Sequence, residues 1–290
     1  MKILIVLIKW PGGVGGGVKN IMNELKLLGH EVDVISRNEY FKTDSLVRSF
    51  FRTRNEIRRL VKEKKYDIIY TQDWSIALPL IFPYPIYRKK HFCMFHGNSC
   101  GLISRGMQNL VAIVLHKHLC CMAPSLKRRF PLANINYCGV NLNKFKNLKK
   151  KRKYLGWIQK GTEKLTKEEV ETISKKINIP LLTAKGLKHE EMNEKFYSHC
   201  KVFISFPPKE AGFQASWLEA MAAGVPIILG NNEGAGEIQP FDKIENEYDL
   251  DSIVQKIKNP KKLDYQKWIK KEDFTWKRHA KKLIEIFNKK

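Results

Sequence analysis

The most informative segment of this chain reads Lys209-Glu-Ala-Gly-Phe-Gln-Ala-Ser-Trp-Leu-Glu-Ala-Met-Ala-Ala-Gly-Val-Pro-Ile-Ile228. A Gly-Phe turn leads into an expected helix that ends at Gly224, and Pro226 opens an apolar β run, which are ordinary stop signals for a helix. A helix N-terminus offers free N–H groups and the positive end of a dipole to an anion. Glu219, further along the same helix, can accept hydrogen bonds from a diol. The segment therefore suits a sugar nucleotide, which carries both a diphosphate and hydroxyl groups.

This segment resembles the donor-site signature of retaining glycosyltransferases of family 4, which have the two-Rossmann GT-B architecture. The family pattern places two Glu residues eight positions apart within Glu-Gly-Phe-Gly…Leu-Glu-Ala-Met-Ala-x-Gly-x-Pro. In this chain Glu219 occupies the second Glu position, whereas Ala211 stands at the first and Glu210 lies one residue early. Gln214 replaces the second Gly of the pattern.

The resemblance implies a role for each matching position. Glu219 would accept the ribose hydroxyls of the donor. Glu210 would position the transferred sugar as a catalytic residue. The donor would also contact the chain around Gly212, Phe213 and Gln214.

A glycine-rich run follows the first expected strand and opens the first expected helix, and it reads Pro11-Gly-Gly-Val-Gly-Gly-Gly-Val18. Glycines let a backbone approach a ligand closely and leave helix N–H groups free. The spacing is not that of a dinucleotide fingerprint, and Ser36-Arg37 stands where an acid would bind a ribose, so an NAD site is disfavoured. The run resembles the first glycine loop of the family, and this resemblance assigns Gly12, Gly13 and Gly15 to donor binding.

A second phosphate-binding candidate is Lys160, within Tyr154-Leu-Gly-Trp-Ile-Gln-Lys-Gly161. This stretch resembles the family's Gly-Arg…Lys-Gly, in which the Arg and the Lys hold the diphosphate. Trp157 takes the place of the Arg here. Lys160 would therefore be the surviving cation, the alternative being a surface lysine in a lysine-rich chain.

Two polar residues end strands expected in the first half. His96 ends the fourth strand, where the family often carries a His near the transferred sugar, so we treat it as a catalytic candidate with a structural role as the alternative. Asp73 ends the third strand and would either contact the acceptor or cap a helix, capping being favoured. The remaining histidines that lack such context are interpreted as structural or solvated; these are His116, His118, His189 and His199.

Short β-branched runs alternate with helical patterns along both halves, which predicts two parallel sheets wound on both faces. Strands are expected at residues 3–8, 31–36, 67–71, 92–95 and 135–138, and then at 154–156, 180–184, 201–206 and after Pro226. Helices are expected at 19–28, 48–65, 167–177 and 190–198 and within 263–290. We predict an α/β fold of GT-B architecture, with two Rossmann-like domains facing an interdomain cleft. The first domain would be 1–146, on the acceptor side, the second 147–265, binding the nucleotide sugar, and 266–290 a helix crossing back to the first.

The net charge of +24 is distributed unevenly, because no Asp or Glu occurs between Asp73 and Glu163. The helix expected at 48–65 mixes cations with apolar residues at helical spacing and suits an anionic membrane surface. A solvated lysine-rich face is the alternative, and a nucleic-acid surface ranks below both because no reading motif accompanies the charge. No stretch has the length of a transmembrane helix, and the apolar run at residues 3–8 predicts a buried strand rather than a signal peptide.

Six cysteines without metal-binding spacing indicate reduced thiols in a cytoplasmic protein, peripheral on a membrane if the basic helix binds lipid. The sequence thus predicts a retaining, metal-independent glycosyltransferase without a cofactor, moving a hexose from a nucleotide-diphosphate sugar to a lipid or glycan acceptor. One alternative is a catalytically impaired nucleotide-sugar-binding protein of the same fold. The other is a transferase acting on nucleic acid.

Overall fold

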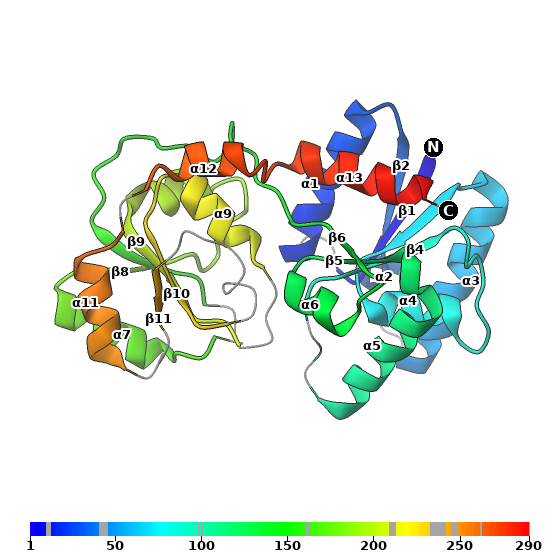
Figure 1. Cartoon of the computed structure of the whole chain (residues 1–290), viewed down its shortest axis with the longest axis horizontal. Coiled ribbons are helices and arrows are strands. Elements are labelled where there is room, and N and C mark those ends of the chain that lie inside the picture. Colours follow the sequence, from blue (N-terminus) through cyan, green and yellow to red (C-terminus); the bar gives the residue numbers. More distant parts are fainter. Residues whose placement is uncertain are drawn as a thin grey trace. The chain divides into compact units, whose positions relative to one another are not determined.

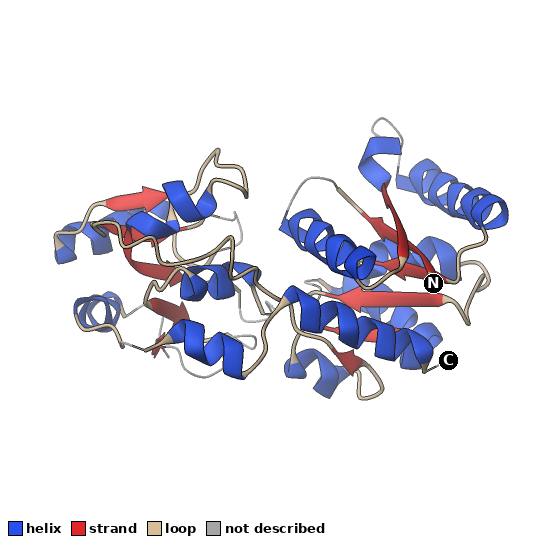
Figure 2. Ribbon diagram, turned by 90° about the horizontal axis from the view of Figure 1, so that it is seen from above, coloured by secondary structure: helices blue, strands red, loops and turns tan. Residues whose placement is uncertain are grey.

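A computed structural model describes residues 1–9, 13–40, 46–97, 99, 101–159, 163–208, 213–232, 242–244, 249–261 and 263–289. The chain forms two compact units (Figure 1). The first comprises Met1–Tyr137 with Trp276–Lys290, and the second comprises Cys138–Thr275. Each unit contains a parallel sheet with helices on both of its faces (Figure 2). The predicted α/β fold with two parallel sheets is confirmed.

The sheet of the first unit has the strand order β2-β1-β3-β4-β5-β6, and neighbouring strands pair in parallel. Its strands are β1 (Lys2–Leu7), β2 (Glu31–Ser36), β3 (Ile68–Thr71), β4 (His91–Phe95), β5 (Leu119–Cys121) and β6 (Asn134–Ile135). The chain order reverses between β1 and β3, because β1 pairs with β2 on one side and β3 on the other. Ligands of doubly wound sheets bind outside the carboxyl ends of the strands at such a point.

Helices pack on this sheet and complete its core. They are α1 (Gly13–Leu27), α2 (Arg37–Tyr40), α3 (Leu46–Lys64), α4 (Trp74–Ile81), α5 (Leu102–Leu115), α6 (Pro124–Arg129) and α13 (Trp276–Asn288). The last helix lies beside α1 (Figure 1). Trp276, at the start of this helix, is 6% exposed and belongs to the core.

The sheet of the second unit has the order β11-β10-β9-β7-β8, again with parallel pairing. Its strands are β7 (Tyr154–Trp157), β8 (Leu181–Thr183), β9 (Cys200–Ser205), β10 (Ile227–Gly230) and β11 (Asp242–Ile244). Its helices are α7 (Lys167–Ile177), α8 (Met192–Lys195), α9 (Ala215–Ala222), α11 (Leu250–Lys258) and α12 (Tyr265–Lys271). The order reverses between β7 and β9, so the segments after these two strands border the expected ligand position of this unit.

The structure divides the chain at Tyr137/Cys138 and again at Thr275/Trp276. The first predicted boundary, at residue 146, is later than the first division. The second, at residue 265, is earlier than the second division. The terminal α13 is part of the first unit.

The apolar residues in the second half of α3 do not face solvent, whereas Phe51 in its first half is 47% exposed. Ile57, Leu60 and Val61 lie in the core of the first unit, packed near Tyr66 and Ile69. The predicted amphipathic pattern therefore reflects packing of the second half of this helix on the core, and its binding to a membrane stays a prediction. Among the helices that the structure describes, none is both long enough and apolar enough to span a bilayer.

Candidate functional site

Helix α9 carries Glu219 and is held firmly at its C-terminal end. Gly224 follows it with a φ of 71°, in the left-handed region that glycine adopts without strain. The Arg152 guanidinium donates to the carbonyls of Ala223 and Gly224. A cation at this position also complements the negative end of the helix dipole. The predicted helix stop at Gly224 is confirmed. Arg152, from the connection between β6 and β7, fixes the end of the helix.

The Glu219 carboxylate has a defined orientation because each of its oxygens has a hydrogen-bonding partner. His189 Nε2 lies 2.7 Å from Glu219 Oε1, and the Tyr197 hydroxyl donates to Oε2 at 3.0 Å. Tyr197 is fully buried, and burial raises the pKa of its hydroxyl well above the ordinary value. Glu219 itself is 9% exposed. The carboxylate is therefore fixed at the boundary between the core and solvent.

A lysine determines which nitrogen of His189 carries the proton. Lys144 Nζ lies 3.0 Å from His189 Nδ1. An ammonium group can only donate, so Nδ1 accepts and the ring proton resides on Nε2, from which it is donated to Glu219. The Phe145 ring packs against both His189 and Tyr197. Lys144, His189 and Tyr197 thus form one polar arrangement that orients Glu219.

Sequence reasoning missed His189, which was interpreted as structural or solvated. Thirty positions separate it from Glu219, and no motif joins the two. A carboxylate has about four acceptor positions, of which the partners named above use two. The remaining lone pairs can accept hydrogen bonds from a vicinal diol.

The residues at the start of α9 have different surroundings. Phe213 is buried, and its ring packs edge-on against Trp217 and stacks with Phe274. Only the backbone of Phe213 remains for donor contact. Gln214 occupies the N-cap position, and its Oε1 accepts a bond from the Ser216 hydroxyl at 3.4 Å.

Three predicted donor-binding residues, Gly12, Lys160 and Gly212, and the predicted catalytic Glu210 lie outside the described residues. Gly13 and Gly15 lie in the first turn of α1, directly after the connection from β1, so the glycine run does open a helix. Trp157, which replaces the family's Arg, is 1% exposed and packs in the core of the second unit. This position therefore supplies no cation to a phosphate.

In the first unit, His96 directly follows β4, as predicted. Its Nε2 lies 3.2 Å from Gln72 Oε1 and its Nδ1 lies 3.3 Å from Met122 Sδ. Burial among these uncharged groups lowers the pKa of His96 from 6.5 to about 4. The ring is consequently neutral at physiological pH and can form a hydrogen bond with a ligand without adding a charge.

Asp73 lies next to this histidine's partner Gln72 and caps α4. Its carboxylate accepts a hydrogen bond from the Ser75 N–H at 2.9 Å. Burial raises the pKa of Asp73, while the bond from Ser75 and the nearby Arg37 guanidinium oppose that rise. The capping interpretation is confirmed, and acceptor contact stays a prediction.

Helix α13 adds a histidine to this neighbourhood that the sequence did not suggest. His279 Nδ1 donates to the Tyr137 carbonyl at 2.6 Å, and the ring lies close enough to His96 for their charges to interact. Burial lowers the pKa of His279 to about 4. Within the described part of the chain, His279 Nε2 and Gln72 Nε2 are buried and have no hydrogen-bonding partner.

The described residues contain no cluster of three His, Cys, Asp or Glu side chains suited to a metal ion. Metal independence remains a prediction, because several candidate residues lie outside the described ranges. Five cysteines are described; all are buried and free of disulfides, namely Cys93, Cys120, Cys121, Cys138 and Cys200.

No protein-family model and no curated protein matches this chain. Solved structures do match it along its whole length. A glycosyltransferase from Rickettsia africae is 16% identical, with a TM-score of 0.68 over 99% of this chain and 98% of that one. HepE from Anabaena, solved with UDP and glucose, is 14% identical, with a TM-score of 0.67 over the whole of both chains. The UDP-GlcNAc 2-epimerase from Methanocaldococcus jannaschii is 12% identical, with a TM-score of 0.59, again over both whole chains. The chain therefore has the α/β fold with parallel sheets that is found in glycosyltransferases of the GT-B type.

Proposed function

We propose that this protein is a retaining glycosyltransferase that moves a hexose from a nucleotide-diphosphate sugar to a lipid or glycan acceptor without a metal ion. The observation that carries the proposal is the arrangement of Glu219, which His189 and Tyr197 orient while they use two of its about four acceptor positions. The likeness to HepE, a protein solved with UDP and glucose, supports the same donor class.

In this proposal the second unit binds the donor. Glu219 accepts the ribose hydroxyls, and the N-terminus of α9 faces the anionic part of the nucleotide. Lys160 and the glycine run with Gly12, Gly13 and Gly15 stabilise the charge that develops on the leaving diphosphate. Such electrostatic stabilisation usually contributes more to catalysis than any other single effect.

The reaction exchanges one bond at the anomeric carbon. The bond from that carbon to the diphosphate oxygen breaks, a bond to the acceptor oxygen forms on the same face, and the acceptor proton passes to the departing diphosphate. Glu210 positions the sugar, and His96 contributes a neutral hydrogen-bonding group near it. Asp73 contacts the acceptor in addition to capping α4.

A second candidate function has one specific observation in its favour. Trp157 is buried in the core where the family has a diphosphate-binding Arg, so the leaving group has one cation fewer. A protein that binds a nucleotide sugar but transfers it poorly, or not at all, would fit this loss.

Two measurements on the full chain test the proposal. Thermal shift against uridine, guanosine and adenosine sugar diphosphates identifies the donor, because a ligand that binds only the folded state raises the melting temperature. NMR of products formed with glycan and lipid acceptors then reports transfer and the anomeric configuration. We expect stabilisation by one nucleotide class and a product with the donor's configuration.

Other outcomes separate the alternatives. Stabilisation without transfer to any acceptor supports the impaired binding protein. An inverted product contradicts the retaining mechanism, and conversion of the donor sugar into its epimer contradicts a transferase. The donor class is wrong if no sugar diphosphate stabilises the protein.

A further inference from the structure

Helix α5 exposes an apolar stripe. Exposure is 89% for Leu102, 80% for Ile103 and 72% for Ile113, and it is 38% for both Met107 and Leu110. Residues three or four positions apart share a face of a helix, so these side chains lie along one side of α5. The opposite side packs in the core of the first unit through Val111, Ala112 and Leu115. The exposed residues are thus a second apolar face, additional to the one that stabilises the fold.

Several cations lie near this stripe. Arg105 on α5 donates to the Ser99 carbonyl at 3.0 Å, Arg129 of α6 donates to Asn109 at 2.8 Å, and Arg88 contacts His116 at the end of α5. The exposed Lys117 follows the helix directly. No acidic residue occurs between Asp73 and Glu163, a range that contains all of these elements.

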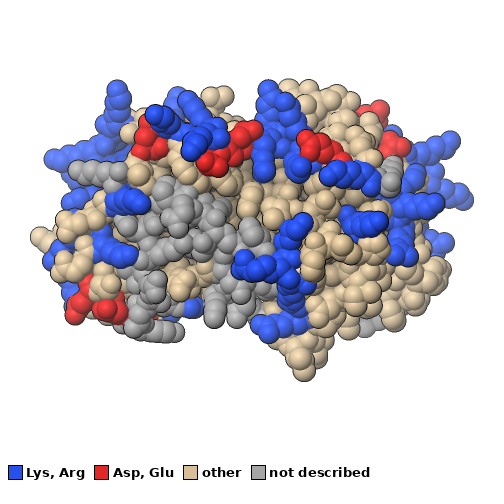
Figure 3. Space-filling view, viewed as in Figure 1, with Lys and Arg blue, Asp and Glu red and all other residues tan. Residues whose placement is uncertain are grey.

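The surface view agrees with this distribution of charge. In Figure 3 the lower edge of the first unit, where Figure 1 shows α5, has no Asp or Glu atoms on the drawn face and has Lys or Arg atoms beside it.

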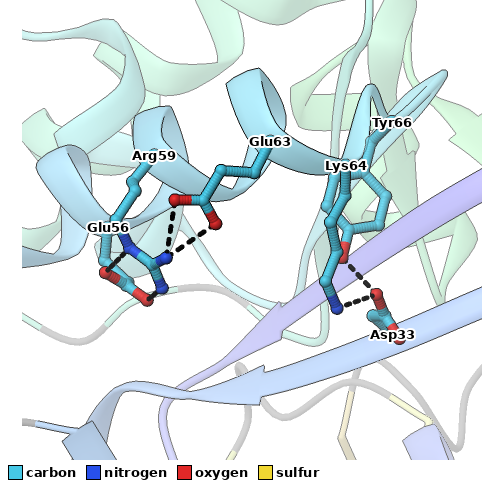
Figure 4. Close-up of polar contacts among 6 residues, drawn as sticks. All are labelled: Asp33, Glu56, Arg59, Glu63, Lys64 and Tyr66. Carbon is cyan, nitrogen blue, oxygen red and sulfur yellow. Dashed lines mark hydrogen bonds and ion pairs between the residues drawn. The ribbon is translucent and has the colours of Figure 1, made fainter.

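Helix α3 carries more cations than α5 but differs from it in two ways. Its residues Ile57, Leu60 and Val61 are in the core, which leaves Phe51 exposed near its start, and acids neutralise part of its outer charge. Arg59 binds both Glu56 and Glu63, at 2.7 Å each, and Lys64 and Tyr66 both bind Asp33 (Figure 4). Of the two helices, only α5 combines exposed apolar side chains with cations in a region free of acids.

We propose that the α5 surface, formed by Leu102, Ile103, Met107, Leu110 and Ile113 with the adjacent Arg105 and Lys117, docks on an anionic lipid membrane. Apolar side chains of an interfacial helix enter the boundary between headgroups and acyl chains, and cations beside them are attracted to anionic headgroups. A second copy of the chain fits this surface less well, because a symmetric contact would bring the same cations together.

The position of this surface is related to the candidate site of the first unit. Gln108 of α5 donates to the Gly97 carbonyl at 2.9 Å and accepts from the Ser99 N–H at 3.1 Å. The segment directly after His96 is therefore attached to α5. An acceptor in the membrane would meet the protein near this segment, but the inference holds whether or not the protein transfers a sugar.

Flotation of the full chain with lipid vesicles tests the inference. We expect binding to vesicles of phosphatidylcholine mixed with phosphatidylglycerol, and weak binding to phosphatidylcholine alone. Replacing Leu102, Ile103 and Ile113 together by serine should reduce partitioning on the order of a hundredfold, because several apolar side chains no longer leave water. Replacing Arg105 and Lys117 by glutamine should reduce it on the order of tenfold at low salt, an effect that added salt suppresses.

Matched variants elsewhere serve as controls. Leu27 on α1 is 80% exposed, so Leu27→Ser removes a comparable apolar side chain outside the α5 surface. Arg58→Gln with Lys62→Gln removes two exposed cations from α3. Both controls should bind vesicles like the wild type, and circular dichroism confirms that each variant is folded.

Four results would overturn the inference. The wild type does not bind vesicles, or it binds neutral and anionic vesicles equally. The α5 variants bind vesicles like the wild type, or the protein self-associates through the stripe and does not bind vesicles.

Discussion

The polar clusters of the two units differ in what surrounds their central side chain. Around Glu219 the neighbours are hydrogen-bond donors, with Lys144 behind His189 and Tyr197 on the other oxygen. Around His96 the neighbours are uncharged, and burial holds its pKa at about 4. The first cluster orients a charged acceptor, whereas the second keeps an imidazole neutral. A fixed acceptor suits donor binding, and a neutral ring suits contact with a sugar or with an acceptor hydroxyl.

The largest effect is expected from removing the charge at Glu219. Glu219→Gln keeps the size of the side chain. Its uncharged amide oxygen is a weaker acceptor for the ribose hydroxyls, and its NH2 group would face the donors His189 and Tyr197. We expect kcat/KM for transfer to fall on the order of 100- to 1,000-fold. Glu171→Gln is the matched control, because this exposed α7 carboxylate pairs with Lys167 at 3.2 Å, away from the Glu219 cluster. A Glu219→Gln enzyme as active as the control would remove the contrast between the clusters.

Three buried histidines of the first unit predict instability in acid. Burial lowers the pKa of His96 and of His279 to about 4, and that of His91 to about 3, all from 6.5. Between these values and 6.5 the unfolded chain binds protons that the folded chain does not, so stability falls as pH falls from 6.5 towards 4. Each histidine contributes up to about 1.4 kcal/mol per pH unit in this window.

Urea denaturation between pH 7 and pH 4.5 measures this dependence. His279→Gln should make the free energy of unfolding depend less steeply on pH, by the contribution of one histidine. A wild-type stability that is constant over this window would mean that these rings are hydrated in solution, and the distinction between the two clusters would fail.

A smaller effect is expected from the groups that orient Glu219. Tyr197→Phe removes a donor from a nearly buried carboxylate and should cost about 1–3 kcal/mol in the free energy of unfolding. His189→Ala should weaken donor affinity about tenfold, because Glu219 loses the bond that fixes Oε1. Tyr66→Phe is a matched control, since that hydroxyl also donates to a carboxylate, Asp33, in the first unit.

The control should lose stability without losing donor affinity. If calorimetry gives Tyr197→Phe and His189→Ala the affinity of the wild type, these side chains have a structural role only, and the polar arrangement around Glu219 does not serve binding.

The smallest effect concerns the cap of α4. Asp73→Ala should cost about 1 kcal/mol of stability, whereas Asp73→Ser should retain most of it, because serine also caps a helix. Asp249→Ala is the matched control, since Asp249 caps α11 through the Ser252 N–H at 3.1 Å. If Asp73→Ser is stable yet inactive, Asp73 contacts the acceptor; if it is stable and active, capping is its whole role.

Much of the fold could be predicted because periodicity is a local signal. Strand β2 and helix α7 have the bounds that the pattern indicated. Strand β5 was missed, because Leu119-Cys-Cys is only three residues long and three helical residues precede it. The helix predicted at 190–198 is divided into α8 and a 3-10 turn at Tyr197–His199, which places the Tyr197 hydroxyl on Glu219.

The candidate site could be predicted where a motif extends along the chain and not where the fold brings distant residues together. The helix with Glu219 and the strand end with His96 are local features, and both were found. His189 and Tyr197 reach Glu219 from other elements, and His279 reaches the neighbourhood of His96 from the last helix. Membrane binding by α3 stays a prediction, because an amphipathic pattern does not reveal whether an apolar side chain meets the core, as Ile57 does, or the solvent, as Phe51 does.

The proposed role of the Glu219 carboxylate can be tested by calorimetry without an acceptor. The sugar diphosphate that stabilises the protein most is titrated into the wild type and into Glu219→Ala. If Glu219 binds the ribose, the folded variant should bind at least about tenfold more weakly, as expected for losing hydrogen bonds to a charged group. A folded Glu219→Ala protein with the affinity of the wild type would show that the donor does not contact this residue.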